Sequence, residues 1–293
     1  MMGLHLVRPD FGPWGPLGEN MPELPEVECV RRTLEPNVLN RQISRIRVEK
    51  LKLARPTPEA LRKGLGGRTI TATSRHGKLL ILHLDDGGFW AIHLGMTGQV
   101  ISAMEKPQAD HIHITVSFKD KGLKLYYRDV RQFGYMAHSP DRAALEAGPL
   151  ANFGPDALGL DLETFLTGLG KRSAPLKNLL LDQRILAGVG NIYADESLHR
   201  AGLSPLARPA GLPRQKLITL HEAVQETLAE ALEKGGSSVR NFVDAEGRAG
   251  TFQEAHRVYK RTGCDCPRCG EDIQRIVLGG RSTHFCPECQ LEK

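Results

Sequence analysis

The chain has 293 residues, with 39 Lys and Arg against 34 Asp and Glu and a formal net charge of +5 at pH 7. This length suggests two domains or one large one, and 40% hydrophobic with 25% charged residues is an ordinary globular composition. No apolar run reaches the roughly 18 residues of a membrane span, and residues 1–20 lack the pattern of a secretory signal. We therefore expect a cytoplasmic protein without a membrane partner, whose mild basicity permits a polyanionic partner but does not establish one.

The first informative stretch begins at residue 21. Residues 1–20 are rich in glycine and proline, and we expect a disordered leader or a misassigned start there. Residues 21–28 read Met-Pro-Glu-Leu-Pro-Glu-Val-Glu. Removal of the methionine would leave Pro22 with a free secondary amine, which can attack a sugar aldehyde carbon and form an iminium ion. Inside a longer chain this nitrogen is an amide, so Pro22 can react only if residues 1–21 are absent from the working protein.

Residues 21–140 favour β structure. One helix is expected to open this region near Pro25, because proline suits a first helical turn, with Val27, Val30 and Leu34 on its buried face. Beyond it, apolar residues mostly alternate in short runs between turn signals. The pattern predicts a mostly antiparallel β-sandwich or barrel, with strands that include residues 43–48, 78–84, 89–93, 111–118 and 123–127.

From about residue 150 the hydrophobic period becomes helical. We expect helices at residues 176–181, 192–200 and 217–232, the first two joined by a glycine-bearing turn at residues 187–190. Gly190 and Asn191 then stand at a helix start, where free amide groups and the helix dipole favour a phosphate.

Five of the six cysteines lie in the last thirty residues. Cys266 and Cys269 form one Cys-x-x-Cys pair and Cys286 and Cys289 another, with sixteen residues between the pairs. Two such pairs can complete a tetrahedral four-sulfur shell without an open position, so we predict one structural zinc ion. Cys264 is expected to be free.

The segment between the cysteine pairs, residues 273–285, is short enough for a β-hairpin. Its tip carries Gly279, Gly280 and Arg281. An arginine beside two glycines can bring a fork of donors close to a phosphate. The alternative is an ordinary exposed arginine.

Several motifs in order along the chain resemble the formamidopyrimidine-DNA glycosylases, from residue 21 to about residue 290. That family opens with the octapeptide at residues 21–28. Further matching motifs stand at residues 93–98 (HLGMTG), 129–134 (DVRQFG), 188–196 (GVGNIYADE), 235–238 (GGSS), 256–259 (HRVY) and 281–287 (RSTHFCP).

The resemblance implies an α+β fold in three parts. These are a catalytic β-sandwich domain with an N-terminal helix at residues 21–140, a helix-two-turn-helix domain with a lesion-capping loop at 150–255, and a zinc finger at 257–291. It also implies a monomeric bifunctional glycosylase and lyase of base excision repair, which removes oxidised purines from damaged double-stranded DNA and then cuts the strand.

Family positions also imply catalytic roles. Pro22 is expected to be the nucleophile that forms a Schiff base with the sugar, and the adjacent Glu23 to move protons during ring opening. Lys78 matches the lysine of β-elimination and Arg281 the arginine of δ-elimination, although an arginine is a poor acid and clamps phosphate more readily. Glu26 would support the reaction, although a carboxylate there is also simply a good helix starter.

DNA contacts follow from the same positions. An enzyme that rotates a nucleotide out of the duplex must fill the space left behind, and Met96, Arg131 and Phe133 match the family's filling residues. Spacing alone would favour core packing for Met96 and Phe133. Phosphate contacts are expected, by resemblance or by charge, from His111, Arg131, Arg172, Lys177 and Asn191. His111 and His113 could pass for a metal pair, but no third ligand accompanies them.

Two other functions remain open. The endonuclease VIII type shares the architecture but prefers oxidised pyrimidines, and its start usually has glycine where this chain has Leu24. A non-catalytic protein that binds lesions would follow if the leader is kept and Pro22 is blocked. Trapping with borohydride separates these alternatives.

Overall fold

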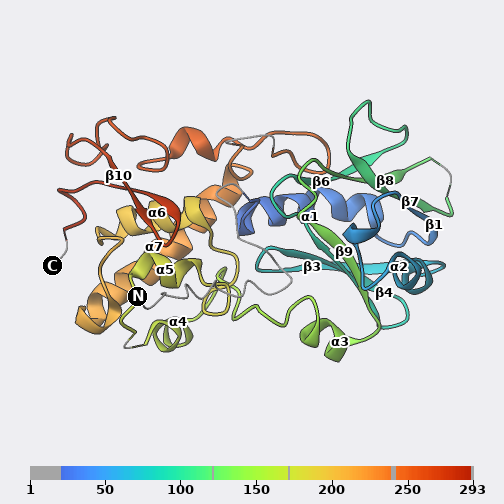
Figure 1. Cartoon of the computed structure of the whole chain (residues 1–293), viewed down its shortest axis with the longest axis horizontal. Coiled ribbons are helices and arrows are strands. Elements are labelled where there is room, and N and C mark those ends of the chain that lie inside the picture. Colours follow the sequence, from blue (N-terminus) through green and yellow to red (C-terminus); the bar gives the residue numbers. More distant parts are fainter. Residues whose placement is uncertain (1–20, 121, 171, 239–241, 292–293) are drawn as a thin grey trace, which may run out of the picture.

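The computed structural model describes residues 21–120, 122–170, 172–238 and 242–291. A β-rich lobe from the first half of the chain lies beside a helical lobe that carries the C-terminal hairpin (Figure 1). The expectation of a disordered leader falls on residues 1–20 and lies outside the described residues.

Helix α1 (Leu24–Val38) opens the described chain and spans the boundary between the lobes. Pro25 occupies its first turn, and Val27, Val30 and Leu34 are buried, as the sequence predicted. The helix contacts β3 and β4 of one sheet, β6 of the other sheet, and α7 of the helical lobe. Its N-terminus is therefore held where the two lobes meet.

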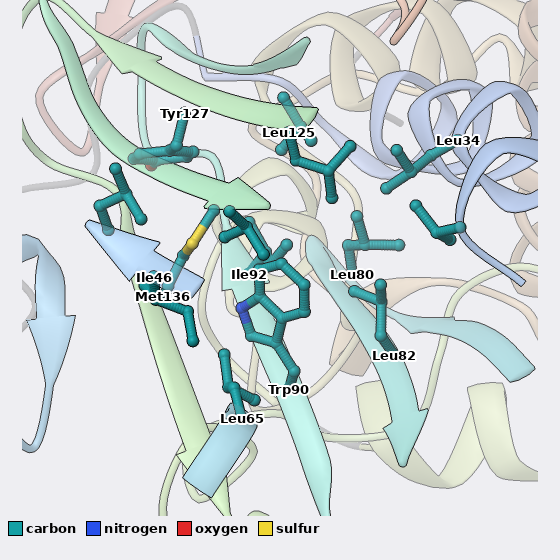
Figure 2. Packing of buried hydrophobic residues seen from close by; sticks show 14 of the residues in the cluster. Leu34, Ile46, Leu65, Leu80, Leu82, Trp90, Ile92, Leu125, Tyr127 and Met136 are labelled. Atoms are coloured by element: carbon teal, nitrogen blue, oxygen red, sulfur yellow. The ribbon is translucent and has the colours of Figure 1, made fainter. Parts of the chain in front are cut away.

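Two sheets form the predicted sandwich. One is antiparallel in the order β1-β7-β8-β6, and the other runs β2-β9-β5-β4-β3 with a parallel contact only between β2 and β9 among the described strands. Their inner faces pack around Trp90, with Ile92, Tyr127 and Met136 in the same cluster (Figure 2). The strands are β1 (Ile43–Val48), β2 (Ala54–Arg55), β3 (Ile70–His76), β4 (Leu79–Leu84), β5 (Phe89–His93), β6 (Gly98–Ala103), β7 (Ile112–Phe118), β8 (Lys124–Asp129) and β9 (Tyr135–Ser139).

The five predicted strands are present with small shifts at their ends. Strands β2, β3, β6 and β9 and helix α2 (Pro58–Leu65) were not predicted. Strand β3 reads Ile-Thr-Ala-Thr-Ser-Arg-His, which lacks the apolar alternation that marks a strand, and only its first residue is fully buried.

The helical lobe has its own core, to which Leu24 of α1 contributes. All three predicted helices are present. The helices of this part of the chain are α3 (Arg142–Ala147), α4 (Leu162–Leu169), α5 (Leu176–Leu181), α6 (Asn191–Ala201) and α7 (Arg214–Glu233). Short 3₁₀ turns occur at η1 (Leu51–Leu53), η2 (Pro209–Gly211) and η3 (Phe252–Ala255).

The C-terminal hairpin pairs β10 (Gln274–Leu278) with β11 (Arg281–Phe285), and Gly279 and Gly280 form its tip as predicted. The cysteine knuckles rest on the C-terminus of α6, because Arg268 donates to the carbonyl of Arg200 at 3.0 Å and Gln290 donates to that of Leu203 at 2.8 Å. Among the described residues, no helix combines the length and apolar character needed to cross a membrane.

Candidate active site and DNA interface

Pro22 precedes Glu23, the N-cap residue of α1, and lines a pocket at the junction of the lobes. The proline is only partly buried, so its ring can be reached from the pocket. Residues of both lobes form the walls, including Glu26, Met96, Arg131, Ile192, Ser237 and Phe242. From positions far apart in the chain, the sequence analysis assigned Glu26 to support of the reaction and Met96 and Arg131 to filling the space in the DNA.

The Glu23 carboxylate caps the first turn of α6, a helix of the other lobe. It accepts hydrogen bonds from the backbone amides of Gly190 at 2.7 Å, Ile192 at 2.9 Å and Tyr193 at 3.4 Å. A side chain at Gly190 would collide with it, since an added Cβ would lie 2.3 Å from the carboxyl carbon. Burial raises the pKa of Glu23 to about 7, against the opposing influence of Lys78. This carboxyl can therefore hold or release a proton near neutral pH.

Glu26 is buried beside Glu23 and joins three segments. One oxygen accepts from the Glu23 backbone amide at 2.8 Å, and the other accepts from the Tyr193 hydroxyl and from the Ser237 amide at 2.7 Å. Burial raises its pKa, while the hydrogen bond from Tyr193 lowers it. These contacts give Glu26 the task of holding α1, α6 and the segment after α7 together around Pro22.

Lys78 stands in the turn between β3 and β4 and is buried against the site. Burial lowers its pKa, the charge of Glu23 raises it, and the charge of Arg281 lowers it. The turn is fixed from the helical lobe by Asp156, which accepts from Arg75 at 2.6 and 2.9 Å and from the Gly77 amide at 2.6 Å. Lys78 is thus not one of the solvated lysines that commonly begin a strand.

Arg281 begins β11 and brings the hairpin tip to the same site. Its charge lowers the pKa of Lys78 and also that of Lys177, in both cases after the larger effect of burial. The hairpin thereby adds a third cation near Lys78 and Lys177, which suits a site for the phosphates of a nucleic acid.

The predicted DNA contact of Lys177 is wrong. Its side chain is 0% exposed, and its ammonium donates to Asp195 at 2.6 Å and to the carbonyl of Ser282 at 2.8 Å. Asn191 donates to the same carbonyl at 2.9 Å. Lys177 therefore holds β11 onto α5 and α6, because a fully buried and paired cation has no reach to a phosphate.

The predicted filling residues lie along one edge of the sandwich. Phe133 is 52% exposed, and the Arg131 guanidinium lies 5.0 Å from the centre of its ring. Met96 is partly exposed in the segment between β5 and β6 and lines the Pro22 pocket. Core packing, the alternative reading of the sequence for Met96 and Phe133, is thus wrong for Phe133.

The two remaining predicted phosphate contacts are exposed. His111 precedes β7 with a backbone φ of 67°, and Arg172 follows α4, where it donates to the carbonyl of Gly168 at 2.9 Å. His113 points inward and shares a hydrogen bond of 3.0 Å with the carbonyl of Asp129. The two histidines therefore have different surroundings.

His93 was not assigned a role from the sequence and belongs to the site. Its ring stacks on Tyr135 at 5.3 Å, and its Nδ1 accepts from the Gly95 amide at 3.1 Å. Burial and then the nearby charge of Lys78 lower its pKa to about 4, so it is a neutral donor through Nε2 near neutral pH. Its position in the 93–98 motif was the only signal in the sequence.

The four predicted metal ligands come together. The sulfurs of Cys266, Cys269, Cys286 and Cys289 lie within 4.8 Å of one another, with pairs at 3.9 and 3.5 Å. Zinc–sulfur bonds of about 2.3 Å in a tetrahedron place sulfurs about 3.8 Å apart. The cluster therefore fits one structural zinc ion, and Cys264 is exposed outside it.

Comparisons with known proteins cover most of the chain. Family models match for the formamidopyrimidine-DNA glycosylase N-terminal domain at residues 21–136, the H2TH domain of the same enzymes at 153–243, and a zinc finger found in FPG and IleRS at 266–291.

Relatives and solved structures agree with these models. Formamidopyrimidine-DNA glycosylases of Solibacter usitatus and Heliobacterium modesticaldum are 41% and 44% identical, over 92% of this chain and 99% and 100% of theirs. Among solved structures, a complex between the Lactococcus lactis Fpg and DNA that contains an abasic site matches with a TM-score of 0.85. The two chains are 37% identical, over 92% of this chain and 99% of that one.

The metal site yields a direct test. Cys286→Ser removes a fully buried ligand, so we expect bound zinc to fall from about one ion per chain toward none and the melting temperature to drop by about 5 °C or more. Cys264→Ser is the matched control and should change neither quantity. Metal analysis and thermal unfolding give the answer, and a full zinc content in Cys286→Ser would contradict the four-cysteine assignment.

Proposed function

The chain belongs to the formamidopyrimidine-DNA glycosylase family, and we propose that Pro22, with a free amine, is its nucleophile. The protein is a DNA glycosylase of base excision repair that acts on oxidised purines, with a lyase activity consistent with its family. The observation that supports the role of Pro22 is its place on a pocket between two lobes, next to a carboxyl whose pKa is about 7.

The first chemical step is displacement of the base. The lone pair of the Pro22 nitrogen forms a bond to C1′ while the bond from C1′ to the base breaks, and the base leaves with the electron pair and takes up a proton. The Pro22 nitrogen then loses its N–H proton, so that its lone pair is again available to open the sugar ring. The C1′–O4′ bond then opens, and the ring oxygen takes its proton from Glu23. The product is an iminium ion that joins Pro22 to the open sugar.

Strand cleavage follows from the iminium ion, which withdraws electrons from C2′. Loss of a C2′ proton expels the 3′ phosphate, and a second elimination expels the 5′ phosphate. Lys78 stands close enough to both Glu23 and Arg281 for their charges to shift its pKa. We assign Lys78 to the first elimination and Arg281 to the second, where each cation holds the departing phosphate.

Recognition of the duplex is assigned to the exposed edge of the sandwich and to the helical lobe. Met96, Arg131 and Phe133 fill the space left by the extruded nucleotide, since apolar side chains wedge between bases and arginine can bond to the orphaned base. The exposed His111 and Arg172 contact phosphates, and Asn191 offers a phosphate the amide hydrogen that its bond to the Ser282 carbonyl leaves over. The enzyme acts as a monomer on DNA in the bacterial cytoplasm.

A single experiment tests the nucleophile and the substrate together. Protein that begins at Pro22 should form a covalent adduct with an 8-oxoguanine duplex under borohydride, whereas the chain with residues 1–21 retained should form at least about 10³-fold less. The reason is that the retained leader makes the Pro22 nitrogen an amide. Gel electrophoresis measures the adduct, and intact mass verifies each N-terminus.

The alternative functions appear as distinct outcomes. Equal trapping of the chain with its leader retained would overturn Pro22 as the nucleophile. Preferential trapping on a thymine glycol duplex would indicate an enzyme for oxidised pyrimidines. Protein that intact mass shows to retain residues 1–21 when purified from its own cells, and that binds the lesion without any adduct, would indicate a non-catalytic lesion-binding protein.

A further inference from the structure

A fully buried carboxylate, that of Asp129, lies behind the edge that carries the filling residues. It ends β8 and accepts two hydrogen bonds, from the Thr97 hydroxyl at 2.6 Å and from the Gly134 backbone amide at 2.8 Å. Thr97 follows Met96 directly, and Gly134 follows Phe133 directly. Asp129 thus joins the two segments that present the filling side chains.

Thr97 extends this connection to Arg131. While its hydroxyl donates to Asp129, the same oxygen accepts from the Arg131 backbone amide at 2.9 Å. One hydroxyl therefore satisfies a buried carboxylate and fixes the backbone of an exposed arginine. Both tasks need a hydroxyl in this position, because a hydrocarbon side chain would leave the Asp129 oxygen and the Arg131 amide without these bonds.

The backbones of the two segments also touch. A Cβ on Gly95 would lie 2.4 Å from the Gly134 nitrogen, and a Cβ on Gly134 would lie 1.8 Å from the Tyr127 hydroxyl oxygen. Gly95 has a φ of 59°, a conformation that favours glycine. The close approach and the Asp129 bonds act together, so the two segments have little freedom to move separately.

A third segment meets the same residue. The Asp129 amide donates to the His111 carbonyl at 3.1 Å, and its own carbonyl shares a hydrogen bond with His113. The backbone of His111, one of the proposed phosphate contacts, is thereby tied to the same point as the filling residues.

We infer that Asp129 and Thr97 are positioning residues for lesion recognition in duplex DNA. They fix Met96, Arg131, Phe133 and His111 relative to one another before DNA arrives. This prior arrangement matters because ordering the side chains during binding would cost conformational entropy and so weaken the affinity for DNA. The inference rests on the proposed DNA roles of these four residues, and the fully buried Asp129 acts without touching the DNA.

The test uses Thr97→Val, which keeps the shape of the side chain and removes its hydroxyl. We choose it because removal of the fully buried Asp129 carboxylate risks unfolding the sandwich. Thr97→Ser is the matched control, since it restores the hydroxyl. Each protein begins at Pro22. One assay measures its affinity for a duplex that carries a tetrahydrofuran abasic analogue. The other measures borohydride trapping on a single-stranded abasic oligonucleotide, in which there is no opposite strand and therefore no gap for the side chains to fill.

We expect Thr97→Val to bind the duplex about tenfold more weakly than the original protein, and to trap the single strand to within about twofold of it. We expect Thr97→Ser to match the original protein in both assays. Unchanged duplex affinity in Thr97→Val would overturn the inference. Equal losses in both assays would also overturn it, because they would show a general structural role. If the original protein gives no adduct on the single strand, the proposed Pro22 chemistry fails, while the duplex affinities still decide the role of Thr97.

Discussion

The cap that Glu23 places on α6 joins the two lobes at the site of the proposed chemistry. Three backbone amides of one lobe bond a carboxylate of the other, and the helix dipole favours negative charge at that point. Burial disfavours the charged form of the Glu23 carboxyl and raises its pKa to about 7. Because Pro22 is bonded directly to Glu23, the cap also sets where the nucleophile can lie. The contact that aligns the lobes is therefore also the proposed proton carrier.

Helix α6 carries this alignment from the pocket to the zinc finger. Beyond its capped end, Asp195 accepts from Lys177 at 2.6 Å and from the His284 amide of β11 at 3.0 Å. Glu196 accepts from the backbone amides of residues 257–259, and His199 lies 3.3 Å from the Cys266 sulfur. The zinc-bound knuckles thus fix the hairpin that brings Arg281 near Lys78. In this way the zinc site near the C-terminus contributes to the geometry of the site around Pro22.

The sequence predicted the helices and strands where hydrophobic periods were strong, and the four cysteines where spacing restricted the ligand geometry. It did not predict β3, whose residues are largely polar, because neighbouring strands and α1 rather than its own pattern define it. Lys177 was misassigned since a lysine in a basic region reads as exposed, and only the fold reveals Asp195 beside it. The Asp129 connection was equally hidden, because its partners come from separate segments. The resemblance to a family could indicate which residues belong to the site, but only the structure shows the hydrogen bonds that hold them in place.

The most direct test of the account locates the covalent bond. The adduct trapped by borohydride on an 8-oxoguanine duplex would be trimmed with nuclease, digested with protease and sequenced by mass spectrometry. Both amines of the site are candidates, since burial lowers the pKa of Lys78 and so favours its neutral form. We predict that the residual sugar is attached to the nitrogen of Pro22 at the N-terminus of the peptide. Attachment to Lys78 in protein that begins at Pro22 would contradict the account.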